Sequence, residues 1–184
     1  MGLIEFLTPR ARRRYSRRQK FFALVLGALG VGVIAPLIMV YASLVIDERL
    51  GFRLAAWPLN VALAAPLLAV GLTFMVWAAW AQWSVGKGTP VPVVPTQKLV
   101  VVGPYRYCRN PMLLGLTLYY TGISLLANSP ACLAFTALVA VVSVAFIKLV
   151  EERELEMRFG EEYLRYKERT PFGYLDFVGA GGEG

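Results

Sequence analysis

The chain has 184 residues, of which 57% are hydrophobic and only 17% are charged. Soluble globular domains carry about 25% charged residues, so this composition excludes an ordinary soluble protein and predicts an integral membrane protein. Seven of the 19 basic residues lie within residues 1–20. We interpret this segment as a cytoplasmic topology signal that contacts anionic lipids, in preference to a nucleic-acid-binding surface.

Two apolar runs follow the basic segment and predict two transmembrane helices within residues 21–84. They cover residues 21–45 and about 55–83, and each exceeds the roughly 20 helical residues that cross a bilayer. A short polar sequence, IDERLGFR, separates them. Pro36 and Pro66 lie inside these runs, and membrane helices tolerate proline where neighbouring helices satisfy the freed carbonyls.

Residues 85–184 begin with a cytoplasmic loop rich in proline and glycine, which favours turns over regular structure. A predicted transmembrane hairpin follows over residues 111–150, in which Asn-Ser-Pro at 128–130 favours a tight turn between two apolar runs. The charged sequence from Glu151 onward predicts a C-terminal amphipathic helix at the membrane interface, broken near Gly160. The predicted fold is therefore all-α and polytopic, with four transmembrane helices and this interfacial helix.

The distribution of lysine and arginine predicts the orientation in the membrane. With the N-terminus in the cytoplasm, four spans return the C-terminus to the cytoplasm. All basic residues except Arg49 and Arg53 then lie on the cytoplasmic side, as the positive-inside rule requires.

The predicted hairpin brings two polar segments together at one membrane face. Its open end places GPYRYCRNPM, residues 103–112, next to residues 148–160. No acidic residue occurs between Glu48 and Glu151, and an unpaired carboxylate at the membrane edge is costly. Arg106 and Arg109 are thus expected near Glu151 and Glu152, although a solvated tail with pairs inside one helix also fits this composition.

Charges of both signs beside aromatic rings favour a zwitterionic ligand with a flat base. Arginine binds carboxylate through two hydrogen bonds, glutamate binds ammonium, and aromatic faces attract cations such as a sulfonium. The rings in these segments are Tyr105, Tyr107, Tyr163, Tyr166 and Phe172. The chain has no histidine and two widely separated cysteines, so we expect neither a metal site nor a disulfide. A reactive Cys108, activated by the flanking arginines, is a minor alternative.

The sequences GKGTPVPVVPTQKLVVVGPYRYCRNPMLLG and EERELEMRFGEEYLRYKERTPFGY resemble the isoprenylcysteine carboxyl methyltransferase family. They resemble the phospholipid N-methyltransferases more weakly. The resemblance covers roughly residues 86–175. It implies that the C-terminal half binds S-adenosylmethionine, with S-adenosylhomocysteine as product, and that Arg109 and Glu152 are catalytic. The cofactor-binding residues it implies are Tyr105, Arg106, Arg109, Asn110, Pro111, Glu151, Glu152 and Tyr163.

Two positions depart from the pattern of that family. Asn110 stands where many members have histidine, and Leu113 replaces a tyrosine that often follows. The resemblance implies methylation of a lipophilic or lipidated acceptor that enters from the bilayer, with an isoprenylcysteine-type carboxyl group as the first expectation. The missing histidine favours an acceptor that is already ionised, because an amine needs a base. A phospholipid amine, another hydrophobic thiol or acid, and a non-catalytic membrane protein are the alternatives.

Overall fold

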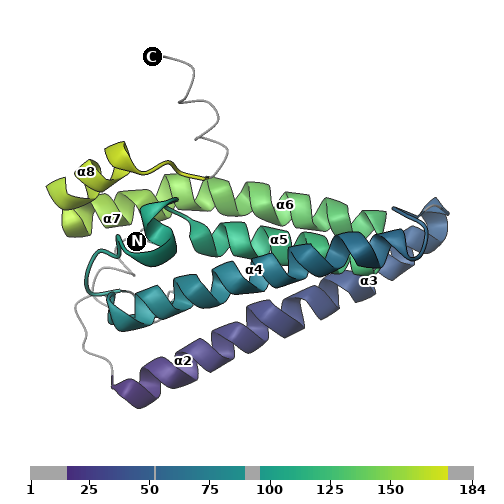
Figure 1. The fold of residues 1–184 in the computed structure, drawn as a ribbon, viewed down its shortest axis with the longest axis horizontal. Helices are drawn as coiled ribbons and strands as arrows, with labels where there is room; N and C mark the ends of the chain where they lie inside the picture. The colour runs from purple at the N-terminus through teal and green to yellow at the C-terminus, as the bar shows by residue number, and fades with distance from the viewer. Residues whose placement is uncertain (1–15, 52, 90–95, 174–184) are drawn as a thin grey trace, which may run out of the picture.

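The computed structural model describes residues 16–51, 53–89 and 96–173. Within these ranges the chain forms helices and connecting segments and no strand, which confirms the all-helical prediction. Figure 1 shows long helices running side by side, with the short helices α7 and α8 gathered at one end. The functional residues predicted from the sequence belong to that end of the molecule.

The first long helix is continuous from Arg17 to Leu50 and consists of three parts. They are α2 (Arg17–Leu29), a π-helical turn η1 (Gly30–Ile34) and α3 (Ala35–Leu50). Ser16 begins it with a capping box, and Gly51 ends it at a φ of 70°, a conformation that favours glycine. The helix is thus longer at both ends than the predicted 21–45, because it also includes polar residues up to the Ser16 cap at its start and the Gly51 cap at its end.

The π-helical turn η1 leaves two backbone carbonyls without their usual helical donors. Pro36 has no N–H to donate to the carbonyl of Gly32, four residues earlier. In the π-helical register, the N–H of Ala35 donates to the carbonyl of Gly30 and not to that of Val31. Two tyrosines of α5 replace these donors. Tyr119 Oη donates to the Gly32 carbonyl at 3.0 Å, and Tyr120 Oη donates to the Val31 carbonyl at 2.7 Å.

Helices α4 (Leu59–Ser84) and α5 (Pro111–Leu126) form the closest helix pair. Glycines allow this approach: a Cβ added at Gly115 would lie 2.8 Å from the Gly71 carbonyl oxygen and 2.9 Å from the Met75 nitrogen. A Cβ at Gly122 would lie 2.8 Å from the Leu68 side chain. Small residues at such contacts are typical of membrane helix packing.

The last long helix contains α6 (Pro130–Phe146), a second π-helical turn η3 (Ile147–Glu151) and α7 (Glu152–Phe159). Gly160, at a φ of +53°, separates α7 from α8 (Glu161–Arg169), which confirms the predicted break. The predicted turn before α6 is also present. There Asn128 Oδ1 accepts hydrogen bonds from the Leu54 and Ala55 nitrogens at 2.9 and 3.1 Å, which joins the two loops at this end.

Three helices in the described ranges are long and apolar enough to cross a membrane: Arg17–Arg49, Leu59–Ser84 and Pro130–Phe159. Most of their apolar side chains face outward, as they do where a helix contacts lipid. Helix α5 is apolar but has 16 residues, about 24 Å of helix against a hydrocarbon core of about 30 Å. The fourth span therefore stays a prediction, as does the interfacial position of the C-terminal helices.

Candidate functional site

The site is built on the segment that leads into α5. A single turn of 3₁₀ helix, η2 (Gly103–Arg106), begins at Gly103, whose φ of +62° suits glycine. Proline at the first position of α5 then begins that helix at Pro111, where the missing N–H costs nothing. These two features fix residues 107–110 as a short irregular stretch at the mouth of the hairpin.

An ion pair joins this stretch to α7. Arg109 Nη1 lies 2.5 Å from Glu152 Oε1, and Lys167 Nζ of α8 lies 3.0 Å from Glu152 Oε2. Glu152 is 6% exposed, so its carboxylate is held between two cations away from bulk water. Because Arg109 and Glu152 meet, the predicted approach of residues 103–112 to residues 148–160 is confirmed.

The segment that follows α8 also contacts this stretch. Arg109 donates its backbone N–H to the Pro171 carbonyl at 2.9 Å, and Asn110 Nδ2 donates to the Phe172 carbonyl at 3.2 Å. Lys148 Nζ lies 4.8 Å from the centre of the Phe172 ring, a cation–π distance. Residues 171–172 therefore connect the end of α8 to the mouth of the hairpin through hydrogen bonds.

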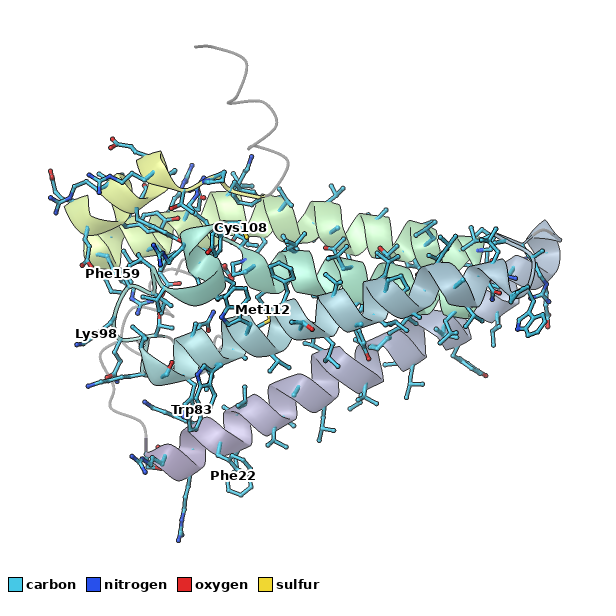
Figure 2. All side chains as sticks on the ribbon, viewed as in Figure 1. Phe22, Trp83, Lys98, Cys108, Met112 and Phe159 are labelled. Carbon is cyan, nitrogen blue, oxygen red and sulfur yellow. The ribbon has the colours of Figure 1, made fainter. Side chains whose placement is uncertain are left out.

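A cavity of about 510 Å³ lies beside the ion pair. One part of its wall is charged and aromatic, with side chains from the η2 segment, α7 and α8. The other part is apolar and comes from α5 and α6. Its lining includes Tyr105, Arg109, Asn110, Glu151, Glu152, Glu154, Arg158, Tyr163 and Tyr166 in the first part, and Met112, Leu113, Leu116, Val142 and Phe146 in the second. In Figure 2, the labelled Met112 and Cys108 lie at the end of the bundle that carries α7 and α8.

Six of the eight residues expected to bind the cofactor line this cavity: Tyr105, Arg109, Asn110, Glu151, Glu152 and Tyr163. The other two lie elsewhere. Pro111 is fully buried at the start of α5, where it helps to fix the position of the neighbouring Arg109 and Asn110. Arg106 is exposed and lines a separate hollow beside α8.

The tyrosines in the cavity wall are neutral phenols. Burial raises the pKa of Tyr105 and Tyr166 far above the ordinary value, and it also raises the pKa of Tyr163, next to Glu152. Tyr166 Oη donates to the Tyr105 carbonyl at 2.7 Å. The aromatic wall is thus fixed by hydrogen bonds between α8 and η2.

The family of the chain follows from its sequence over this same region. The family model described as phospholipid methyltransferase matches residues 59–162, more than half of the chain. The chain belongs to the phospholipid methyltransferase family.

Curated relatives support the same assignment. The chain is 38% identical over 85 residues to protein-S-isoprenylcysteine O-methyltransferase from Mus musculus and to the protein of that name from Rattus norvegicus. The similarity covers 45% of this chain and 29% of each relative, so it spans less than a third of the relatives' length. No solved structure matches. The resemblance seen in the sequence is thereby confirmed at the level of the family.

The region that matches the phospholipid methyltransferase family runs from the start of α4 through α7. It contains the whole hairpin and most of the cavity wall, and it ends one residue before Tyr163. The first long helix lies outside it, in agreement with the absence of any specific motif there.

Three residues were not predicted as part of the site: Gln82 and Arg158, which line the cavity, and Lys167, which pairs with the cavity residue Glu152. Gln82 of α4 donates through Nε2 to Tyr105 Oη, although nothing in the local sequence distinguishes it from an interfacial amide. Lys167 was missed because its partner, Glu152, lies 15 residues earlier on another helix. Arg158 pairs with Glu154 at 3.0 Å and also donates to the Thr96 carbonyl. Only the spacing of Glu154 and Arg158, four residues apart on one helix, signals such a pair.

Cys108 is buried and does not fit a reactive thiol. Its exposure is 1%, and burial raises its pKa above the ordinary value. The alternative that flanking arginines activate this thiol is therefore wrong, because the cysteine side chain packs inward while Arg106 points outward. Among residues 16–51, 53–89 and 96–173, no cluster of three or more histidine, cysteine or acidic side chains could hold a metal ion.

Two buried polar atoms at the cavity lack a partner within the described part of the chain. They are Arg109 Nε, a donor, and Gln82 Oε1, an acceptor. Buried polar atoms are nearly always hydrogen-bonded. A ligand in the cavity that has both an acceptor and a donor group could form hydrogen bonds with these two atoms.

Proposed function

We propose that this chain is an integral membrane methyltransferase that uses S-adenosylmethionine and acts on a lipophilic acceptor. The observation that carries the proposal is the 510 Å³ cavity, which has a charged, aromatic part built on the Arg109–Glu152 pair and an apolar part between α5 and α6. Its volume is within the usual range for small-molecule and cofactor sites. Most of its lining falls in the region that defines the phospholipid methyltransferase family.

The residues of the charged part fit the cofactor's functional groups. Arg109 has an unpartnered Nε that suits a carboxylate. Glu151 lines the cavity, and the structure gives its carboxylate no hydrogen bond or ion pair with another described residue; it suits an ammonium group. Tyr105 and Tyr163 offer rings beside a base or a sulfonium. When bound, S-adenosylmethionine supplies a methyl group attached to a positively charged sulfur.

Glu152 is proposed as a positioning residue. Both of its carboxylate oxygens are already engaged, one by Arg109 and one by Lys167, so it has little capacity left for a ligand. By holding the guanidinium of Arg109, it keeps the unpartnered Nε at the cavity wall. Arg109 itself would contact the cofactor, while Asn110 and Pro111 fix the start of α5.

The apolar part of the cavity is proposed to take the acceptor. Leu113, Leu116, Val142 and Phe146 come from two helices whose outer faces are apolar, so a lipid chain could reach them from the bilayer. The two curated relatives are named for isoprenylcysteine, and we take an isoprenylcysteine-type carboxylate as the first acceptor. An ionised carboxylate needs no general base, and the chain has no histidine to serve as one.

A phospholipid amine is the second candidate acceptor. The cavity's unpaired Glu151 carboxylate and the name of the family favour it, because a glutamate can attract an ammonium headgroup or accept its proton. Treatment of the labelled product with mild base distinguishes the two acceptors, since a methyl ester releases its label and an N-methyl group keeps it.

The arrangement in the membrane is part of the same proposal. We place four spans across the bilayer, with α5 as the third, and both termini and the cofactor cavity in the cytoplasm. The segments are then residues 1–20 as a basic cytoplasmic arm, 21–84 as two spans, and 85–184 as the cofactor-binding half, whose C-terminal helices lie at the lipid interface.

Binding of S-adenosylhomocysteine to the purified protein in detergent tests the cofactor site. Calorimetry should show binding by wild type and a loss of about tenfold or more in affinity for Arg109→Ala and for Glu151→Gln. Arg153→Gln, which changes an exposed residue of α7, is the matched control and should bind as wild type does. No binding by wild type would favour a non-catalytic membrane protein.

A further inference from the structure

A second hollow, of about 620 Å³, lies between α8 and the segment that leads into η2. Its wall is formed by one face of α8 and by the extended segment that precedes η2. The residues are Leu99, Val101, Arg106, Glu162, Arg165, Tyr166, Arg169 and Thr170. It shares only Leu99 and Tyr166 with the proposed cofactor cavity, so the two spaces are distinct and adjoin at these residues.

Three arginines from two separate elements converge on this hollow. Arg165 and Arg169 are one helical turn apart on α8, and Arg106 reaches it from η2. No carboxylate of the described residues lies within ion-pair distance of any of the three. Glu162 is the one acidic residue in the wall, and it leaves an excess of two positive charges.

The arginines of this hollow, all three exposed, contrast with the less exposed cations nearby. Arg109, Arg158 and Lys167 each have a glutamate partner at 2.5 to 3.0 Å. Within the described part of the chain, Arg165 donates only through Nε, to the backbone carbonyl of Glu161 at 3.3 Å. The terminal guanidinium nitrogens therefore remain available to an external anion.

We propose that this hollow binds a phosphate group, carried by a lipid headgroup or free in the cytoplasm. Guanidinium groups present planar, paired donors that match phosphate oxygens. The hollow lies at the end of the bundle where α7 and α8 gather (Figure 1) and where Lys20 of α2 donates to the Lys87 carbonyl. That end faces the cytoplasm in our topology, and basic pockets on the cytoplasmic side of membrane helices bind anionic headgroups.

Thermal unfolding in dodecyl maltoside, with three probes, tests this site. The probes are dioctanoyl phosphatidylglycerol, dioctanoylglycerol, which has the same acyl chains without phosphate, and inorganic phosphate. A ligand that binds only the folded protein raises its melting temperature. We expect phosphatidylglycerol to raise it and dioctanoylglycerol to leave it unchanged. An equal rise with inorganic phosphate identifies free phosphate as sufficient, and no rise with it identifies the lipid headgroup.

Variants of α8 locate the effect. Replacing Arg165 and Arg169 together by glutamine should weaken phosphate binding about tenfold or more. The matched control replaces Lys98 and Arg153, exposed cations that lie outside the hollow, by glutamine and should keep the wild-type affinity. An equal loss in both double variants, or an equal rise with phosphatidylglycerol and dioctanoylglycerol, overturns the proposal.

A variant that binds phosphate more tightly provides a second test, because misfolding of the variant could not produce this result. Glu162→Gln removes the one carboxylate from the wall of the hollow and should tighten phosphate binding several-fold. Glu161→Gln removes the same charge from the neighbouring, exposed position outside the hollow and should have little effect. Equal changes in these two variants would show that net charge alone attracts the phosphate, and this would also overturn the proposal.

Discussion

Neutralising Glu152 should destabilise the folded protein far more than neutralising its neighbour Glu156. Glu152 is 6% exposed and its carboxylate contacts both Arg109, at 2.5 Å, and Lys167, at 3.0 Å. Removing one partner of a buried ion pair costs about 3–5 kcal/mol. Because glutamine keeps the shape of the side chain and one acceptor oxygen, we expect Glu152→Gln to cost the lower value, about 3 kcal/mol.

This cost can be measured as a shift in the melting temperature. For a chain of this size, each kcal/mol lowers the melting temperature by about 2–4 °C, so Glu152→Gln should lower it by about 6–12 °C. Glu156 binds the same lysine at 2.8 Å, but its side chain is 34% exposed, and exposed pairs contribute about 0.2–1 kcal/mol. Tryptophan fluorescence of both variants in detergent makes the comparison. Equal shifts for Glu152→Gln and Glu156→Gln would refute the reasoning that burial sets the strength of this network.

Two further predictions concern the helix packing that supports the site. Gly115→Ala should destabilise the bundle by about 1–3 kcal/mol, because the added Cβ meets backbone atoms of α4; Gly30→Ala, where nothing lies within 4 Å, should not, and a comparison of melting temperatures checks this. Tyr120→Phe should cost about 1–3 kcal/mol by leaving a carbonyl of η1 without its donor. The exposed Tyr41→Phe is its control in the same melting experiment, and equal stability of the two variants would argue against the role of the hydroxyl.

The hairpin and its charged mouth could be predicted because strong local signals determine them. Asn128 and Pro130 mark the turn, and the apolar runs on either side have similar lengths, so the two open ends must meet. The first acidic residues after a long gap, Glu151 and Glu152, then lie opposite the basic loop. These are consequences of helix length and turn chemistry, which a single sequence contains.

The choice among the charged residues could not be predicted in the same way. Arg106 and Arg109 are three residues apart, but Arg106 ends a 3₁₀ turn and Arg109 lies in the irregular stretch that follows, so no helical period relates their directions. The structure turns Arg109 into the cavity and Arg106 outward to the second hollow. Gln82 joins the site from α4 through its hydrogen bond to Tyr105 of η2, a tertiary contact with no local signature.

The π-helical turns could be predicted from the sequence only in part. Pro36 predicts a carbonyl without its donor, but the tyrosines that satisfy the freed carbonyls are nearly 90 residues away. In η3, the turn ends at Glu151, directly before the ion-paired Glu152. Such turns are frequent at functional sites, and the apolar sequence around this one carries no signal for it.

Transfer of a labelled methyl group tests the central claim most directly. Purified protein is incubated with S-adenosylmethionine labelled in its methyl group and with a total membrane extract, and the lipid-soluble label is counted. The account predicts label in a hydrophobic product with the wild type and little with Arg109→Ala, while Arg153→Gln retains activity. Wild-type label no higher than that of Arg109→Ala would contradict the assignment of this cavity as the site of methyl transfer.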